Sequence, residues 1–371
     1  MNKILFISAF PPSNKTAGQN YTCQLLNDLS KDYKIDMIYW SYAGHKAIVP
    51  EEVNIREEIV LTKVQKVFNA IKAFIFFPLF TVRFDWRVCR QIQKIALDYD
   101  IVYYDFSQIF LYSLFIRHPF KIFMCHDVIS QKYSRKRLSS LYLWLVKLTE
   151  SLLLKTAHLR LCFSAKDVTY IMREFCLSAQ KVSFYISDQI RCTNQLNYEV
   201  GNYFVLFGAW NRPENYEGLL WFCEKVLPHC DISCVVIGGG MSEDVKRKAE
   251  CDKLKCVGFV DNPYTLIASS VALIAPIFQG AGVKVKVVES LALGIPIIGT
   301  DIAFEGIDNI EYSINKQALI LANNAYEFIQ KIKEFEFPSI VEKESIRTSF
   351  MRNYQCNSFR SILETIEADR N

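Results

Sequence analysis

The sequence predicts an α/β protein built from two doubly wound domains, each a parallel sheet covered by helices on both faces. Three observations support this fold class. Short apolar runs of strand length alternate with longer segments of helical periodicity, the pattern of a parallel sheet. The 371 residues are enough for two domains with separate cores. A polar, turn-rich stretch at 187–202 interrupts the alternation near the middle of the chain.

The first domain is expected to span residues 1–190. Ser164 and Asp167 have the spacing of a capping box at the start of its last helix, so we interpret them as structural. Its strands are predicted at 4–8, 34–39, 101–104, 121–125, 159–163 and 181–186, with helices at 18–29, 110–117, 140–155 and 166–175.

The second domain is expected to span residues 200–345, after an interdomain linker at 187–202. Open parallel sheets bind their ligands beyond the carboxyl ends of the strands, so the loops that follow these strands are the candidate sites. The strands are predicted at 203–207, 232–237, 255–259, 271–275, 295–299 and 318–321.

The composition excludes several classes of protein. With 51% hydrophobic and 22% charged residues the chain is globular, and a net charge of +4 argues against a dedicated nucleic-acid binder. Twelve cysteines occur without a Cys-x-x-Cys pair, and none of the five histidines has zinc-site spacing, which fits a reducing cytoplasm. No secretory signal is visible, and the apolar run at 73–82 is too short to span a bilayer. We therefore expect a cytoplasmic protein that is soluble or peripheral.

The most informative segment is 276–307. Gly280 and Gly282 form a loop that opens a helix from about Lys284, and this helix ends before Gly294. Unpaired N–H groups and the helix dipole make such a start an anion site. Lys284 and Lys286 lie in the first turn, where cations oppose the dipole, so we expect a bound anion to compensate. Glu289, further along the helix, can accept hydrogen bonds from a diol. Together these features predict a nucleotide diphosphate-sugar site.

This segment resembles the donor-site signature of retaining GT-B glycosyltransferases, in particular glycosyltransferase family 4 (glycosyl transferases group 1). Glu289 matches the second Glu of the family's Glu-x7-Glu pattern, and Gly294 and Pro296 match the Gly-x-Pro that follows. Ala281 stands where many members have the first Glu, which leaves the identity of the sugar open. The alternative interpretation is a buried αβ unit of an ordinary α/β protein.

The resemblance implies the GT-B architecture, two Rossmann-like domains facing across a cleft, with a C-terminal helix at about 350–371 packing back on the N-terminal domain. It implies transfer of a hexose-type sugar from a nucleotide diphosphate-sugar to a saccharide acceptor, with retention at the anomeric carbon. The leaving phosphate would assist the incoming hydroxyl, and lysines would neutralise it, so we expect neither a metal nor a further cofactor.

Further motifs of the C-terminal domain match the family. Gly239, within three consecutive glycines after a strand, would let the backbone approach the donor, although it can also be a simple turn. Phe259 and Val260 are expected beside the nucleobase. Gly208 and Arg212 belong to the loop that usually supplies cations to the diphosphate; the alternative for Arg212 is a solvated loop charge.

Two positions of the N-terminal domain complete the prediction. The resemblance places Gly18 at the leaving phosphate and His126 beside the reacting sugar, with Asp127 as an orienting or capping group. The alternatives are a strand-to-helix turn for Gly18 and a hydrogen-bonded structural role for His126. Glu150 also matches the family and is interpreted as structural.

Residues 62–95 and 131–147 combine many basic residues with apolar ones, and Asp85 is their single acid. Basic residues interleaved with aromatics suit an element that lies on anionic lipid. A solvated helix face would also explain each stretch. In a glycosyltransferase this pattern favours a lipid-linked saccharide acceptor of a cell-surface polysaccharide or lipopolysaccharide pathway.

Two other functions remain open at the level of sequence. A sugar-nucleotide epimerase of the same fold would need catalytic carboxylates that the sequence does not identify. A non-catalytic partner or binding subunit could have kept the fold after loss of the first motif Glu.

Overall fold

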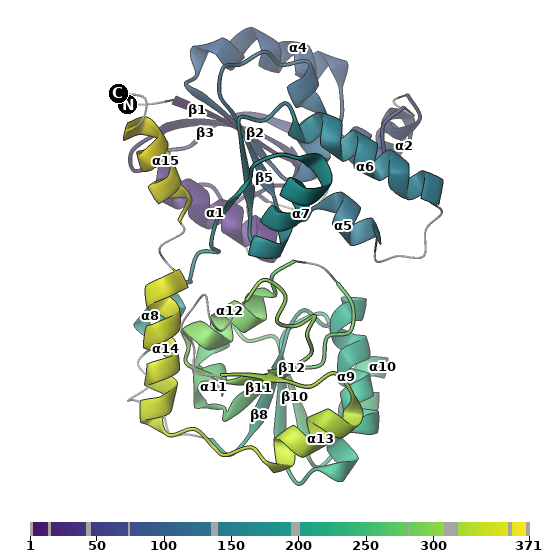
Figure 1. The fold of residues 1–371 in the computed structure, drawn as a ribbon, viewed down its shortest axis with the longest axis vertical. Coiled ribbons are helices and arrows are strands. Elements are labelled where there is room, and N and C mark those ends of the chain that lie inside the picture. Colours follow the sequence, from purple (N-terminus) through teal and green to yellow (C-terminus); the bar gives the residue numbers. More distant parts are fainter. Residues whose placement is uncertain are drawn as a thin grey trace. The chain divides into compact units, whose positions relative to one another are not determined.

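The computed structural model describes residues 3–13, 16–41, 46–72, 75–134, 140–193, 201–280, 282–307, 318–354 and 358–368. The chain forms two compact units, shown in Figure 1: Met1–Tyr185 with Asn357–Asn371, and Ile186–Cys356. Each unit has its own sheet and its own buried apolar core. Both are α/β units, as the sequence predicts.

The N-terminal unit contains a seven-stranded parallel sheet in the order β3-β2-β1-β4-β5-β6-β7. Its strands are β1 (Lys3–Ser8), β2 (Lys34–Ser41), β3 (Asn54–Val60), β4 (Ile101–Asp105), β5 (Lys121–Cys125), β6 (Leu159–Cys162) and β7 (Gln180–Lys181). Its helices are α1 (Ala17–Leu29), α2 (Lys63–Lys72), α3 (Pro78–Thr81), α4 (Trp86–Ile95), α5 (Ile129–Ser134), α6 (Ser140–Leu154), α7 (Ala165–Phe175) and the 3-10 segments η1 (Ala96–Asp98) and η2 (Ser107–Leu114).

The C-terminal unit contains a six-stranded parallel sheet in the order β10-β9-β8-β11-β12-β13. Its strands are β8 (Phe204–Phe207), β9 (Cys234–Ile237), β10 (Leu254–Gly258), β11 (Ala272–Ala275), β12 (Ile297–Gly299) and β13 (Leu319–Leu321). Its helices are α8 (Asp188–Cys192), α9 (Pro213–Lys225), α10 (Glu243–Ala249), α11 (Tyr264–Ser269), α12 (Val285–Ala292), α13 (Ala325–Lys333), α14 (Ile340–Tyr354) and the 3-10 segment η4 (Leu227–His229).

The strand order indicates where a ligand site is expected in each unit. Six strands of each sheet follow the order 3-2-1-4-5-6 of a Rossmann fold, so the chain reverses its direction of winding once. The reversal lies between β1 and β4 in the first unit and between β8 and β11 in the second. A crevice opens beyond the carboxyl ends of the two strands at such a switch point.

Each of the twelve predicted strands overlaps an observed strand, and the structure differs from the prediction in several other elements. β3 was not predicted, the helix expected at 110–117 is the 3-10 segment η2, and the expected linker contains α8. Residues 194–200 of that linker lie outside the described part of the chain. Of the C-terminal helices, α14 belongs to the second unit and α15 (Phe359–Ala368) to the first.

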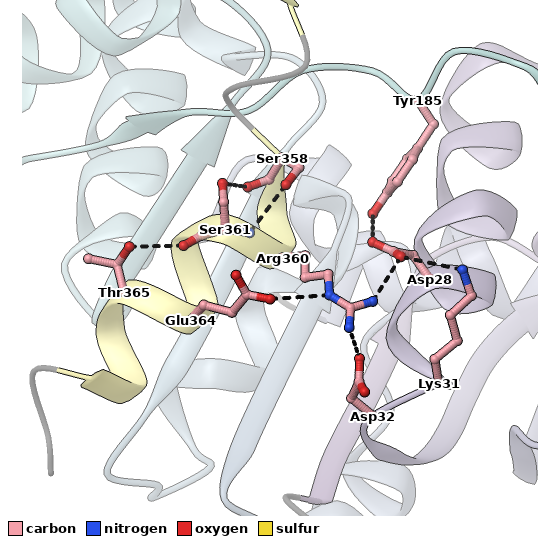
Figure 2. Close-up of polar contacts among 9 residues, drawn as sticks. All are labelled: Asp28, Lys31, Asp32, Tyr185, Ser358, Arg360, Ser361, Glu364 and Thr365. Carbon is pink, nitrogen blue, oxygen red and sulfur yellow. Dashed lines mark hydrogen bonds and ion pairs between the residues drawn. The ribbon is translucent and has the colours of Figure 1, made fainter. Parts of the chain in front are cut away.

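α15 is held on the N-terminal unit by both packing and charge. The Phe359 ring packs against Tyr103 in the core, with centroids 5.3 Å apart. Figure 2 shows the Arg360 guanidinium reaching two carboxylates of the first unit, Asp28 at 3.3 Å and Asp32. Tyr185 donates a second hydrogen bond to Asp28, so the anchor joins three separate segments of this unit.

Candidate functional site

In the C-terminal unit, the loops beyond β8 and β11 bring together residues from four elements. Gly208 follows β8 directly, and a Cβ atom built on it would lie 2.8 Å from the Lys286 Nζ. A side chain at this position would push the lysine ammonium away from the end of β8. Gly238, after β9, has a φ of 128°, and a Cβ there would come within 1.9 Å of the Gly208 carbonyl oxygen. These two glycines allow the loops that follow β8 and β9 to approach each other closely.

Two lysines stand at the start of α12. Lys284 is its N-cap residue, and its Nζ donates to the Gly282 carbonyl at 2.7 Å and lies 3.8 Å from the buried Glu305 carboxylate. Lys286 Nζ donates to the Asn215 Oδ1 at 2.8 Å. Burial lowers the pKa of Lys286 to about 7, and the Glu214 carboxylate offsets this only in part. The nearby carboxylate therefore does not fully stabilise the charged form of Lys286, and a bound anion would favour that form.

Glu289 lies on α12 beyond the lysines. Its carboxylate accepts a hydrogen bond of 2.8 Å from the Tyr264 hydroxyl of α11. Burial raises the pKa of Glu289 to about 7, while the hydrogen bond from Tyr264 and the charge of Lys286 act in the opposite direction. A half-buried carboxylate with a pKa near neutrality is typical of a functional site rather than of a solvated helix face.

The other predicted residues of this unit lie in three places. Gly280 and Gly282 adopt φ values of 120° and 72° in the loop before α12, so their backbone takes a conformation that favours glycine. Gly239 lies against Phe259, which is 75% exposed, and Val260 is half-buried. Arg212 is exposed at the start of α9, 4.0 Å from Glu214, so it is less tightly held than either lysine.

In the N-terminal unit, a buried carboxylate marks the switch point. Ser8 and Asp105 end β1 and β4 in register, and the Ser8 hydroxyl donates to Asp105 Oδ2 at 3.0 Å. Thr22 of α1 donates to the same oxygen at 2.7 Å. His126 Nε2 lies 2.7 Å from the other oxygen, Oδ1. Asp105 thus holds the imidazole in one orientation, with Nδ1 directed away from the carboxylate.

Gly18 lies against this imidazole. A Cβ atom on Gly18 would come within 3.0 Å of His126 Nδ1 and 2.9 Å of Phe106 Cε1. Phe106 has a φ of 70°, unusual for a bulky residue, and its ring stacks on His126 with centroids 3.7 Å apart. The structure therefore brings the predicted pair Gly18 and His126 together, on a platform that includes Phe106 and Asp105.

The remaining predicted residues of this unit are structural. Asp127 pairs with Lys132 at 2.7 Å. The buried Glu150 accepts from the N–H groups of Ile129 and Ser130, which begin α5, and burial raises its pKa to about 7. The capping box is confirmed: Ser164 accepts from the Asp167 N–H and donates to its carboxylate.

The apolar run expected to contact lipid is largely part of the core. Phe77 and Phe80 are buried, which corrects the expectation, for these two residues, that the aromatics among the basic residues of 62–95 lie on lipid. Phe74 and the basic cluster at 135–137 lie outside the described residues. None of the helices in the described segments is long and apolar enough to cross a bilayer.

Sequence reasoning missed several of the residues that lie at the switch points of the two units. Asp105, Phe106 and Tyr264 follow or lie near predicted strand ends, and that position was the one available signal. An Asp-x-Asp pattern is also present, Asp98-Tyr99-Asp100, at the amino end of β4 and thus opposite the switch point, where Asp100 accepts from the Lys3 N–H. Among the residues that the structure describes, no three His, Cys, Asp or Glu side chains gather into a metal site.

Residues 201–335 match the family described as Glycosyl transferases group 1. The chain resembles group 1 glycosyltransferases. The matched residues contain Gly208 and Lys286, which lie together after β8, and Lys284 and Glu289 of the same α12 segment. An uncharacterized 44.6 kDa protein in the cps region of Klebsiella pneumoniae is 21% identical over 267 residues, which cover 67% of this chain and 59% of that protein. The chain thus spans less than two thirds of the curated relative's length.

Solved glycosyltransferase structures share the fold over its whole length. Sucrose-phosphate synthase from Thermosynechococcus elongatus is 14% identical with a TM-score of 0.67, and the match covers 100% of this chain and 98% of the synthase chain. Anabaena HepE in complex with UDP is 14% identical with a TM-score of 0.64, and the match covers 99% of this chain and 100% of the HepE chain. The lipopolysaccharide outer core galactosyltransferase WaaB is 13% identical with a TM-score of 0.64, covering 99% of each chain. At such identities the likeness establishes the GT-B fold.

Proposed function

We propose that this protein is a glycosyltransferase that moves a hexose-type sugar from a nucleotide diphosphate-sugar to a saccharide acceptor, with retention of anomeric configuration. One observation carries the proposal: Lys284, Lys286 and Glu289 follow one another along the first turns of α12, within the segment that matches the glycosyltransferase family, and the charges of Lys286 and Glu289 interact. The match of structures that bind UDP, such as HepE, supports a nucleotide-linked donor.

The residues of α12 divide the work of donor binding. Lys286 is to hold the diphosphate, because its ammonium lies at the switch point and its hydrogen-bond partner among the described residues, Asn215, is neutral. Lys284 and the loop amides are to share that charge. Glu289, one turn further, is to accept hydrogen bonds from the ribose hydroxyls, and the exposed Phe259 is to face the nucleobase.

We propose a direct reaction on one face of the sugar, which the contacts of Asp105 support. Asp105 is fully buried and saturated by Ser8, Thr22 and His126, so it cannot attack an anomeric carbon. The protein would then act by positioning the reactants and by stabilising the departing diphosphate. With lysines at the phosphates, the reaction needs no metal.

We further propose a lipid-linked saccharide as acceptor, bound by the N-terminal unit at the cytoplasmic face of the membrane, in the synthesis of a cell-surface polysaccharide or lipopolysaccharide. The likeness to the outer core galactosyltransferase WaaB and to a protein of the cps region supports this choice.

Release of free nucleotide from UDP-, GDP- and ADP-sugars by the purified protein is the test. The wild-type protein should hydrolyse one donor slowly without an acceptor, and Lys286→Ala should lose this activity while it keeps its fold. If Lys284→Ala and Lys286→Ala both keep full activity, the phosphate site lies elsewhere, with Arg212 as the first candidate. Nucleotide binding without any release would favour the alternative, a non-catalytic binding subunit.

A further inference from the structure

Helix α2 of the N-terminal unit turns its apolar side to the solvent. Val64, Val67, Phe68 and Ile71 follow the i, i+3, i+4, i+7 spacing of one helix face, and all four are between 55% and 78% exposed. Asn69, on the opposite side, is half-buried and donates to the Val82 carbonyl at 3.3 Å. This is the reverse of an ordinary surface helix, whose apolar stripe faces the core.

Helix α6 shows the same feature. Leu141, Trp144, Leu148 and Leu152 form a continuous exposed stripe along its outer face. Its inner face is buried and includes polar groups: Thr149 accepts from the Phe77 N–H at 3.0 Å, and Glu150 caps α5. The exposed leucines and tryptophan are therefore not needed to hold α6 in place.

Both helices contact the segment Phe77–Thr81, which contains α3 and the residue before it. In Figure 1, α2 and α6 are drawn within the same unit. α2 packs against α3 directly. Phe77, the residue before α3, packs its ring on Tyr142 of α6 with centroids 5.1 Å apart. A row of four large exposed apolar side chains on each of two such helices is a feature that soluble monomers rarely show without a partner.

The two helices carry more basic than acidic residues. The sequence of α2 contains Lys63, Lys66 and Lys72 and no acidic residue, and Lys63 is exposed. Lys155 is exposed just beyond the end of α6, and Glu150, the one acid of α6, is buried. Apolar and aromatic side chains flanked by lysines suit the headgroup region of an anionic bilayer, where the rings insert and the ammonium groups stay at the phosphates.

We propose that this docking surface, formed by the exposed apolar residues of α2 and α6 with Lys63 and Lys155, binds the surface of an anionic lipid bilayer. The binding is peripheral, with both helices lying along the interface. The inference deepens the proposed function. It rests on that function in one respect: docking would bring the N-terminal unit to a lipid-linked acceptor. Lipid binding itself does not depend on the identity of the reaction.

Co-sedimentation of the full chain with vesicles tests the proposal. The vesicles contain phosphatidylcholine alone or mixed with phosphatidylglycerol, at low and at high salt. The wild-type protein should pellet with the anionic vesicles and leave them as salt screens the lysines. The test variant is Val64→Glu with Leu141→Glu, whose positions are 78% and 73% exposed. Its partition onto anionic vesicles should fall by on the order of tenfold or more, the effect of losing two inserted side chains.

The matched control is Val341→Glu with Leu97→Glu, at positions 78% and 71% exposed outside the docking surface. It changes charge and composition equally and should bind vesicles as the wild type does. Three results would overturn the proposal: wild-type protein that stays in the supernatant with anionic vesicles at low salt, an equal loss in the control, or no loss in the test variant. A different result would show an interface between copies instead: wild type and control that are dimers in light scattering and do not bind vesicles, with a test variant that is a monomer.

Nucleotide binding measured without vesicles separates this inference from the proposed function. The test variant should bind UDP, GDP or ADP as the wild type does, because its changes lie in the other unit from α12. Loss of vesicle binding with nucleotide binding intact would support the docking surface. Intact vesicle binding by a protein that binds no nucleotide would leave the docking surface in place and refute the donor site.

Discussion

The low pKa of Lys286 predicts that nucleotide binding takes up a proton above neutral pH. Burial lowers the pKa of this ammonium to about 7. At pH 8, therefore, only about a tenth of empty sites carry the charge. A diphosphate beside Nζ favours the charged form and raises the pKa again. Binding at pH 8 should then take up about 0.9 proton per nucleotide, falling as the pH is lowered through 7.

Choosing pH 8 separates Lys286 from Glu289, the other group with a displaced pKa. Burial raises the pKa of Glu289 to about 7, and hydrogen bonds from ribose hydroxyls would favour its ionised form. Ribose binding therefore releases a proton at lower pH. At pH 8 about nine tenths of the Glu289 carboxyls are already ionised, so their contribution is about 0.1 proton or less.

Calorimetric titration of UDP, GDP and ADP in buffers with different protonation enthalpies measures this uptake. The apparent enthalpy of the nucleotide that binds should depend on the buffer in the wild-type protein and not in Lys286→Met. The control Lys331→Met, at a lysine of α13 that pairs with Glu334, should behave as the wild type. A wild-type enthalpy independent of buffer at pH 8, or the same dependence in Lys286→Met, would refute the role of Lys286 at the phosphate.

Three further substitutions test residues that position His126, shape the loop after β9, or hold α15 on the N-terminal unit. Asp105→Asn should lower kcat, because His126 loses its orienting carboxylate, and leave the nucleotide affinity of the other unit unchanged; equal kcat would dismiss the positioning role. Gly238→Ala should destabilise the C-terminal unit by about 3 kcal/mol or more in denaturant unfolding, because its Cβ would overlap the Gly208 carbonyl. Arg360→Ala should cost the N-terminal unit roughly 0.5–1 kcal/mol, the scale of exposed ion pairs, and a larger loss would mean that α15 docks cooperatively.

The strands of both sheets could be predicted because most are apolar runs buried on both faces. β3 escaped because it is an edge strand with the sequence Asn-Ile-Arg-Glu-Glu-Ile-Val, of which only one residue is buried. Edge strands keep charged side chains on their exposed side, which removes the apolar signal. The same limit explains the phenylalanine run: periodicity shows that Phe77 and Phe80 are apolar, but not which surface covers them.

The candidate site divides in the same way. Lys284, Lys286 and Glu289 could be predicted because they lie within one short segment whose helix fixes their spacing. Asp105 could not, because its role depends on Ser8, Thr22 and His126, which the sheet register brings to it from three other segments. The exposed stripe of α2 could not be predicted either, since its pattern equals that of a helix that buries the same residues.

The binding of UDP, GDP and ADP to the full chain, measured as a shift in thermal unfolding for the wild type and Glu289→Gln, tests the central claim most directly. The account predicts that one nucleotide stabilises the wild type by mass action, and that Glu289→Gln weakens this binding by roughly 1–3 kcal/mol. Glu224→Gln, at an exposed position of α9, should leave it unchanged. A wild-type protein that none of the three nucleotides stabilises, or a Glu289→Gln variant that binds as tightly as the wild type, would contradict a donor site at α12.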